Sequence, residues 1–309
     1  MVAFKGSNVT FKVRLFINCG FFTNFQYEAH RPPNLATFFC LPAYSFQKKG
    51  KVKADLTVVS FNIRYGTPGD GINVWKNRKS LIFNVFKKYK GGIIATQEAL
   101  LRQIDELKDE IPKMGVVYRT RHEDDESGES MAIFYDKKTW NALDEETFWF
   151  SDTPEVPGSR SWGNSLPRIT TVAIFESKIN EKKIRIVNTH LDHRSENSRE
   201  KSIELILSKI KNYDPSIPTI IVGDLNAAPD DPIIKKLEAA QFQDSYTGPT
   251  LEGCTYHKWD GGRHCERIDY IFYPKNSGFE LIDSGVDRYK KQGRYPSDHF
   301  PIYAKFKLN

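Results

Sequence analysis

An acid and an amide follow a short apolar segment in the stretch PTIIVGDLNAAPDD, residues 218–231. The pattern predicts a buried β-strand, and Asp224 and Asn226 stand two positions apart at its end. Residues at alternate positions of an extended chain point to the same side. We therefore expect Asp224 and Asn226 to project together beyond the sheet. The alternative is an ordinary turn, in which Asp and Asn are common.

Other predicted strands end in the same kinds of polar side chain. The segments FNIR, IIATQE and VNTHLD end with Asn62, Arg64, Glu98, His190 and Asp192. In RIDYIF, Asp269 lies within a predicted strand, and Asp298 and His299 stand just before the last strand. Each residue alone is explained by a turn, but six such strand ends with almost no lysine favour one shared site.

These residue types suit phosphoryl transfer assisted by a divalent cation. Mg²⁺ takes oxygen ligands, usually one or two carboxylates, and bridges to substrate phosphate. Glu98 is the natural ligand, helped by Asn62 and Asp298. Two histidines near the cation can serve as acid and base, because their reference pKa lies near neutrality. The cysteine and histidine spacing fits no structural zinc site.

Predicted helices and strands carry these side chains from residue 55 onward. Helical spacing of apolar residues predicts helices over 76–90, 100–110 and 195–212. Strands are predicted over 55–63, 91–99, 130–136, 146–151, 168–177, 182–192, 219–226, 266–273, 279–286 and 300–307. This mixture predicts a single α+β domain over residues 55–309, with sheets at the centre and helices outside.

The first 54 residues differ from the rest in charge. They hold eight of the 45 Lys and Arg residues and one of the 39 acidic residues, which leaves 37 basic against 38 acidic residues in 55–309. Because residues 55–309 are nearly neutral, their composition does not support strong non-specific binding of nucleic acid. We expect 1–54 to be a basic extension, either poorly ordered or used for targeting. We expect an intracellular protein, cytoplasmic or, through this extension, mitochondrial.

Membrane insertion is not expected. No apolar run approaches the ~18–20 residues that span a bilayer. We expect a protein without a transmembrane segment that is a monomer.

The ordered motifs SFNIR, TQEA, NTHLDH, VGDLN, RIDYIF and SDH resemble those of the endonuclease/exonuclease/phosphatase superfamily, which has the DNase I-like fold. The resemblance covers residues 55–309. It implies a four-layer α/β/β/α sandwich, with two central mixed β-sheets flanked by helices. It also implies a Mg²⁺ site, open to Mn²⁺ as a substitute, with Asn62, Glu98 and Asp298 as the metal residues.

The resemblance also implies catalytic roles. His190 matches a general acid or phosphate-contacting histidine, while Asp224 and Asn226 match residues that position the attacking water and stabilise the phosphorus. His299 matches the general base, with Asp269 as its carboxylate partner.

Further matches concern orientation and substrate binding. Glu129 matches a carboxylate that orients His190, and Arg64 and Arg168 match contacts to substrate phosphate. A surface ion pair is the alternative for Glu129 and Arg168.

Tryptophans are candidates for lining a substrate pocket, namely Trp75, Trp149 and Trp162. Trp149 alternates within a predicted strand, so core packing is favoured for it.

Two differences from related families narrow the range of expected substrates. Inositol-polyphosphate 5-phosphatases carry Arg where this chain has Ala228, and abasic-site endonucleases carry Tyr where it has His190. We expect a Mg²⁺-dependent hydrolase of a small or lipid-like phosphate ester, as monoesterase or diesterase. A DNA or RNA nuclease is the alternative, and an inactive binding scaffold is the least favoured interpretation.

Four cysteines are too few for a disulfide framework in 309 residues. Cys254 and Cys265 flank a predicted hairpin and could meet, but free thiols in a reducing compartment are the favoured interpretation.

Overall fold

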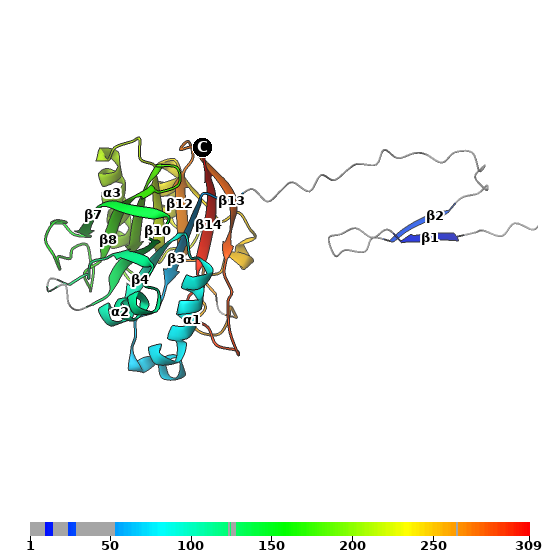
Figure 1. The fold of residues 1–309 in the computed structure, drawn as a ribbon, viewed down its shortest axis with the longest axis horizontal. Helices are drawn as coiled ribbons and strands as arrows, with labels where there is room; N and C mark the ends of the chain where they lie inside the picture. Colours follow the sequence, from blue (N-terminus) through cyan, green and yellow to red (C-terminus); the bar gives the residue numbers. More distant parts are fainter. Residues whose placement is uncertain (1–9, 15–23, 29–52, 123, 125–127, 264) are drawn as a thin grey trace, which may run out of the picture. The chain divides into compact units, whose positions relative to one another are not determined.

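The computed structural model describes residues 10–14, 24–28, 53–122, 124, 128–263 and 265–309 (Figure 1). The chain divides into two units, residues 1–50 and 51–309. In the first unit, β1 (Thr10–Arg14) pairs antiparallel with β2 (Asn24–Glu28). The rest of the N-terminal extension lies outside the described residues, so its order and any targeting function stay predictions.

Two six-stranded mixed sheets form the centre of the second unit (Figure 1). One sheet runs β13 (Phe279–Val286), β14 (Ile302–Leu308), β3 (Leu56–Asn62), β4 (Ile93–Ala99), β6 (Ser130–Asp136) and β5 (Met114–Val117). The other runs β11 (Phe242–Asp244), β12 (Asp269–Pro274), β10 (Thr219–Asp224), β9 (Lys183–His190), β8 (Ile169–Ser177) and β7 (Trp140–Trp149). The pairs β3–β4 and β9–β10 are parallel, and the other pairings within these sheets are antiparallel.

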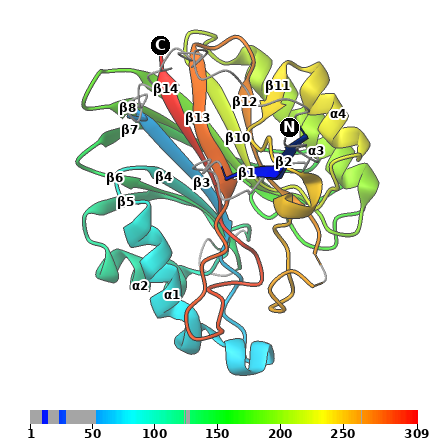
Figure 2. The ribbon, with the colours of Figure 1, turned by 90° about the vertical axis from the view of Figure 1, so that its right-hand side faces the viewer.

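Helices cover the outer faces of the two sheets, as Figure 2 shows. The first sheet carries α1 (Trp75–Lys88) and α2 (Leu101–Glu110), preceded by the 3₁₀ turn η1 (Pro68–Asn73). The second carries α3 (Glu196–Asn212) and α4 (Pro232–Ala239), and a second 3₁₀ turn, η2 (Thr250–Gly253), follows β11. None of the helices in the described part of the chain has the length and hydropathy of a membrane-spanning segment.

Three apolar clusters hold the four layers together. The inner faces of both sheets meet in one cluster, which includes Val58, Ile93, Ile186, Val222 and Ile271, each at most 1% exposed. A second cluster joins α1 and α2 to the first sheet, and a third joins α3 and α4 to the second. Burial of apolar surface on each side of each sheet explains why the strands read as nearly continuous apolar runs. The predicted four-layer α/β/β/α sandwich is confirmed.

The predicted helices over 76–90, 100–110 and 195–212 are confirmed as α1, α2 and α3. Within residues 55–309, the helix and strands that were not predicted are α4, β5 and β11. These elements have eight, four and three residues, too short for a clear apolar period.

The prediction of free thiols at Cys254 and Cys265 is wrong in the structure, which joins them in a disulfide. Tyr256 forms an isolated antiparallel bridge with Glu266, so the chain folds back on itself here and the two Cα atoms lie 5.5 Å apart. That separation is normal for a disulfide.

Candidate active site

Four strand ends meet at one edge of the two sheets. Because β3 and β4 are parallel, Asn62 and Glu98 emerge at the same edge of the first sheet. Because β9 and β10 are parallel, His190 lies directly beside Asp224 in the second, and Asp269 of β12 pairs with Asp224 on its other side. The parallel pairs thus bring together side chains that are far apart in the sequence.

The Asp224 carboxylate lies at the centre of the site. Its Oδ2 accepts a hydrogen bond from Asn62 Nδ2 at 3.1 Å, and lies 3.5 Å from Nε2 of His190 and 3.8 Å from Nε2 of His299. Burial, reinforced by the negative charge of Asp269, raises the pKa of Asp224 to about 7. This carboxylate can therefore accept or release a proton near neutral pH.

His299 and Asp269 form a buried hydrogen-bonded pair. The Nδ1 atom of His299 lies 2.8 Å from Oδ2 of Asp269, which leaves Nε2 turned toward Asp224. Burial alone would lower the pKa of His299, but the Asp269 charge and hydrogen bond outweigh it and raise the pKa to about 10. His190 differs, because burial and the nearby Arg168 lower its pKa. The two histidines therefore have opposite protonation preferences.

Two further carboxylates face the same cavity, Glu98 from β4 and Asp298 from the segment before β14. Glu98 accepts hydrogen bonds from Asn62 Nδ2 at 2.9 Å and from the backbone N–H of Tyr65 at 3.1 Å. Burial, with a contribution from the Glu98 charge, raises the pKa of Asp298 although His299 opposes this. A pair of largely buried carboxylates facing one cavity is a donor set that suits a hard divalent cation.

The predicted metal residue Asn62 is hydrogen-bonded to carboxylates of both sheets. Its amide oxygen accepts the backbone N–H of Arg64 at 3.0 Å, and its NH₂ group donates to Glu98 and Asp224. The amide oxygen keeps a second lone pair, so the role of Asn62 as a metal residue stays a prediction. Its NH₂ group holds one carboxylate of each sheet in place.

Asp224, Asp269 and His299 form another group of ligand atoms, all within 4.8 Å of one another and buried. A metal ion at this group is chemically possible. However, two of these three ligand groups, His299 and Asp269, already share a proton in a short hydrogen bond. We therefore interpret this trio as a proton-transfer group and Glu98 with Asp298 as the cation pair.

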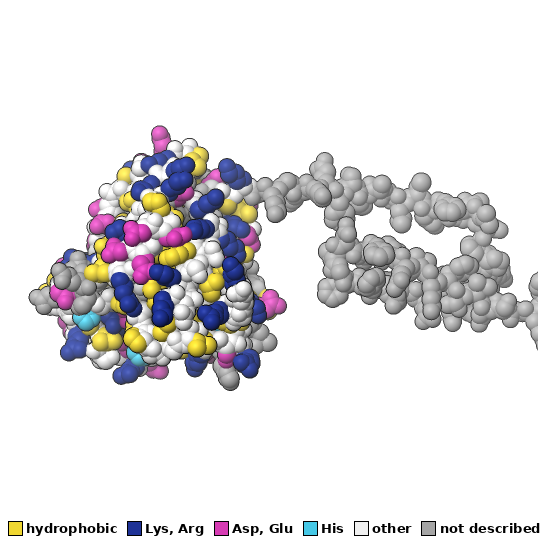
Figure 3. All heavy atoms as spheres, turned by 60° about the horizontal axis from the view of Figure 1, so that its bottom comes forward, with side chains coloured by type: hydrophobic (Ala, Val, Ile, Leu, Met, Phe, Trp, Pro, Cys, Tyr) yellow, Lys and Arg dark blue, Asp and Glu magenta, His cyan; other side chains and the backbone are white. Residues whose placement is uncertain are grey.

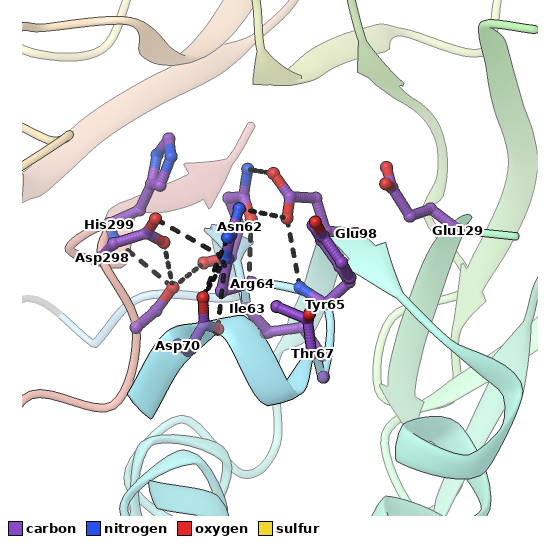
Figure 4. A network of polar contacts seen from close by, with 12 residues as sticks. Asn62, Ile63, Arg64, Tyr65, Thr67, Asp70, Glu98, Glu129, Asp298 and His299 are labelled. Atoms are coloured by element: carbon purple, nitrogen blue, oxygen red, sulfur yellow. Dashed lines mark hydrogen bonds and ion pairs between the residues drawn. The ribbon is translucent and has the colours of Figure 1, made fainter. Parts of the chain in front are cut away.

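Arg64 lines the cavity, as expected of a phosphate contact, and also binds a carboxylate that the sequence did not single out. Figure 4 shows its guanidinium beside Asp70, which lies in η1. Nε and Nη2 of Arg64 contact the Asp70 carboxylate at 2.9–3.3 Å. The position of Asp70 in an irregular turn, away from any strand end, explains why it was missed.

The expected role of Glu129 in orienting His190 is not seen in this structure. An isolated bridge between Thr120 and Ser130 places Glu129 opposite Arg121, and their side chains pair at 2.9 Å. Figure 4 shows Glu129 apart from the network around Glu98. The Nδ1 atom of His190 has no hydrogen-bond partner among the described residues. Glu129 nevertheless lines the cavity, so the surface ion pair is not supported either.

Arg168 lines the cavity and is itself paired. Its Nε lies 3.4 Å from Asp192, and its Nη2 lies 2.9 Å from Nδ1 of His193. Together with Arg121 and His193, it lines a cavity of about 630 Å³. Arg121, His193 and the nearby Tyr256 were not predicted; of these, only His193 had a signal, as the last residue of NTHLDH.

Backbone geometry marks the site residues. Three of them have a left-handed backbone, with φ of 56° at Arg64, 63° at Glu98 and 48° at Asn226. The sheet register shifts between Thr96 and Ala99, which accounts for the turn at Glu98. The strand ends at Asp224, so Asn226 does not reach the site by alternation; both residues still line the cavity.

The tryptophans have other partners. Trp162 is not among the residues that line this cavity, and its indole N–H donates to Asp152 at 2.8 Å. Trp75 is buried against α2, where it donates to Glu106. Trp149 is 3% exposed, which confirms its predicted core position.

Arg78 ties the first strand end to the segment before Asp298. Its buried guanidinium donates to the backbone carbonyls of Ile63 at 2.6 Å, Arg64 at 2.7 Å and Pro296 at 3.0 Å. Ile63 and Arg64 lie 233 and 232 positions before Pro296 in the sequence (296 − 63 and 296 − 64). Arg78 therefore fixes the spacing of the residues around the carboxylate pair.

Comparisons with known proteins agree with this geometry. The model of the endonuclease/exonuclease/phosphatase family matches residues 59–299. An uncharacterized protein of Acanthamoeba polyphaga mimivirus is 30% identical over 181 residues, which are 55% of this chain and 67% of the viral protein.

Two solved structures from Bacteroides are similar over most of their length. An endonuclease/exonuclease/phosphatase from Bacteroides vulgatus is 28% identical with a TM-score of 0.77, covering 82% of this chain and 99% of that one. A mannosyl-6-phosphatase from Bacteroides thetaiotaomicron is 27% identical with a TM-score of 0.71, covering 81% and 99% respectively.

Proposed function

Because the chain belongs to the endonuclease/exonuclease/phosphatase family, whose members hydrolyse phosphoesters, we propose that it hydrolyses a small phosphate ester with Mg²⁺ as cofactor. Mn²⁺ is the expected substitute. The observation that carries this proposal is that one cavity is lined by a carboxylate pair and by Asp224 and His299, with His299 held from behind by the buried Asp269.

Glu98 and Asp298 are the proposed holders of the cation. Bound there, a divalent cation would neutralise developing negative charge on the transferring phosphoryl group. The contribution of Asn62 is to hold Glu98 through its amide N–H.

We assign proton transfer to Asp224 and His299 together, rather than to His299 alone. The raised pKa of His299 favours an imidazolium at neutral pH, which cannot accept a further proton. Asp224, with a pKa near 7, has the affinity that suits a general base at neutral pH. Its carboxylate would accept the proton of the attacking water, while the charged ring of His299 remains beside it, oriented by Asp269.

The remaining residues of the cavity suit contacts to a phosphoryl group. His190, whose pKa is lowered, is neutral at neutral pH and can donate one hydrogen bond. Asn226 lines the cavity beside it. The guanidinium groups of Arg121 and Arg168 also line the cavity and supply positive charge near His190, which suits a phosphate with two negative charges.

Cavity size and surface charge favour a small ester over nucleic acid. About 630 Å³ falls in the range of small-ligand sites. On the face in Figure 3, basic side chains are interspersed with acidic and apolar ones rather than gathered in a band. The similar Bacteroides thetaiotaomicron protein is a phosphatase of a phosphorylated sugar, which supports testing phosphorylated sugars first.

The test is a substrate panel on the full chain. Sugar phosphates, other small monoesters, small diesters and single- and double-stranded oligonucleotides are incubated with Mg²⁺, Mn²⁺ or EDTA, with Glu98→Gln as the metal-site control. We expect turnover of small monoesters that is lost with EDTA and in Glu98→Gln. Turnover of oligonucleotides alone would establish the nuclease instead, and turnover unaffected by EDTA and Glu98→Gln would refute the metal site.

A further inference from the structure

The guanidinium of Arg64 lies among three carboxylates (Figure 4). Nη1 lies 3.9 Å from Oε2 of Glu98, and Nε lies 3.9 Å from Oδ2 of Asp298. These are the two carboxylates to which the proposed function assigns the cation. The third carboxylate, Asp70, is much closer and accepts hydrogen bonds from two guanidinium nitrogens. Arg64 is therefore docked on Asp70 and faces Glu98 and Asp298 across a short gap.

Arg64 interacts with Asp70 in a different way from Glu98 and Asp298. Contacts of 2.9–3.3 Å with Asp70 are hydrogen bonds between charged groups, which are directional and strong. At 3.9 Å no hydrogen bond forms, and only Coulomb attraction links Arg64 to Glu98 and Asp298. The side chains of these two acids are 12% and 10% exposed, so solvent screens that attraction weakly.

Among the described side chains, that of Arg64 forms ion pairs with both Glu98 and Asp298. Arg78, the other guanidinium close by, donates to backbone carbonyls instead and is fully buried. Largely buried carboxylates are costly without a nearby positive charge. Arg64 supplies such a charge to Glu98 when no cation is bound, and it shares that role at Asp298 with His299.

The backbone of Arg64 is fixed while its side chain has room to move. Its N–H is held by Asn62 and its carbonyl by Arg78, so the Cα position is anchored. The side chain is 26% exposed and lines the cavity. Motion of the guanidinium between Asp70 and the acid pair therefore needs no change in the fold.

We propose that Arg64 is a built-in counter-cation of the metal site, which competes with the divalent cation for Glu98 and Asp298, and that Asp70 restrains this competition by docking the guanidinium. The proposal rests on the proposed function in that it takes the cation to bind these two acids. Two opposite effects follow. Removing the Arg64 charge should tighten cation binding, while removing the Asp70 charge should release Arg64 toward the acids and weaken it.

The test is calorimetric titration of the metal-free protein with Mg²⁺ and with Mn²⁺, without substrate. We expect Arg64→Gln, which keeps a polar group near Asp70, to lower Kd about tenfold, equal to ~1.4 kcal/mol. Asp70→Asn should raise Kd by a similar factor, and Arg64→Lys should stay near wild type. Arg160→Gln removes an exposed charge that has no carboxylate partner among the described residues, and it serves as the control for net charge.

A double variant separates competition from simple charge loss. If Asp70 acts through Arg64, Asp70→Asn in the Arg64→Gln background should change Kd less than threefold. An equal or higher Kd for Arg64→Gln than for wild type would overturn the proposal, as would a full Asp70→Asn effect in the double variant. Failure of the proposed metal site has a different signature, because wild type would then bind no cation or Glu98→Gln would bind it normally.

Thermal unfolding in EDTA gives a second readout that does not depend on activity. We expect Arg64→Gln to lower Tm in EDTA because Glu98 and Asp298 lose part of their charge compensation. Saturating Mg²⁺ should raise the Tm of this variant more than that of wild type. An unchanged Tm in EDTA would contradict the compensating charge of Arg64.

Discussion

The amide nitrogen of Asn62, on one sheet, donates a hydrogen bond to the carboxylate of Asp224, on the other, at 3.1 Å. The same NH₂ group donates to Glu98 at 2.9 Å. One side chain thus connects the proposed cation pair to the proton-transfer group. The relative position of the two groups depends on it.

Replacing Asn62 with Ala should therefore lower kcat more than it lowers stability. We expect a loss of about 10–10²-fold, because both carboxylates lose a partner, and a fall of about 1–3 kcal/mol in the free energy of unfolding. Steady-state kinetics and denaturant unfolding measure the two effects. Asn84→Ala, which removes an exposed amide, is the control. Normal kcat in Asn62→Ala would show that the two groups are positioned independently.

His299→Ala should lower kcat by about 10²–10⁴-fold, as expected for a group that takes part in proton transfer. Asp269→Asn should have a smaller effect, because the ring stays in place but loses the charge that raises its pKa. If Asp224 is the base, the acidic limb of the wild-type kcat profile should lie near pH 7, and it should move to lower pH in Asp269→Asn because Asp269 also raises the pKa of Asp224. A wild-type limb near pH 10 would return the function of general base to His299.

Arg78→Met should destabilise the fold by about 2–4 kcal/mol, since several buried carbonyls lose a charged donor. Urea unfolding measures this, with Arg160→Met as the exposed control. Mg²⁺ affinity should fall as well, because the segment before Asp298 is no longer tied to Ile63. A stable variant with normal affinity would contradict this positioning role.

His257 should make the metal-free protein sensitive to acid. Its ring is fully buried against Phe300 and Tyr295, and neither ring nitrogen has a hydrogen-bond partner among the described residues. Burial, helped by the charge of His299, lowers its pKa to about 4. Between about pH 6.5 and 4 the unfolded chain therefore binds a proton that the folded chain does not.

Stability should accordingly fall as pH drops through this window and level off below it, by at most about 3 kcal/mol from His257. His257→Phe should remove this part of the pH dependence in EDTA while leaving stability above pH 7 nearly unchanged. Unfolding by urea at several pH values measures it. An identical slope in wild type and variant would assign the acid sensitivity to other groups.

Much of the fold could be predicted because the strands are buried on both faces and read as apolar runs. The same runs end in Glu98, His190 and Asp224, so the site could be predicted from where the runs stop. Asp70 and Arg121 could not be predicted in this way. Asp70 lies in a 3₁₀ turn without periodicity, and Arg121 is brought to the cavity by a single isolated bridge.

Pairing partners were harder to predict than positions. Glu129 is at the cavity as expected, yet it binds Arg121 instead of orienting His190. Sequence spacing does not determine which of several nearby cations a carboxylate will contact. The Cys254–Cys265 disulfide could not be predicted for a related reason. A reducing compartment favours free thiols, and the spacing of the two residues does not show how closely the fold-back brings them together.

The left-handed backbone at Arg64 and Glu98 has an evolutionary consequence. Glycine adopts such φ values freely, whereas other residues incur a conformational cost there. A gene copy released from selection for catalysis would gain stability by acquiring glycine at these two positions. Glycine at position 98 in a homologous chain, where the proposed cation ligand is lost, should therefore mark a lineage that has abandoned the chemistry while keeping the fold.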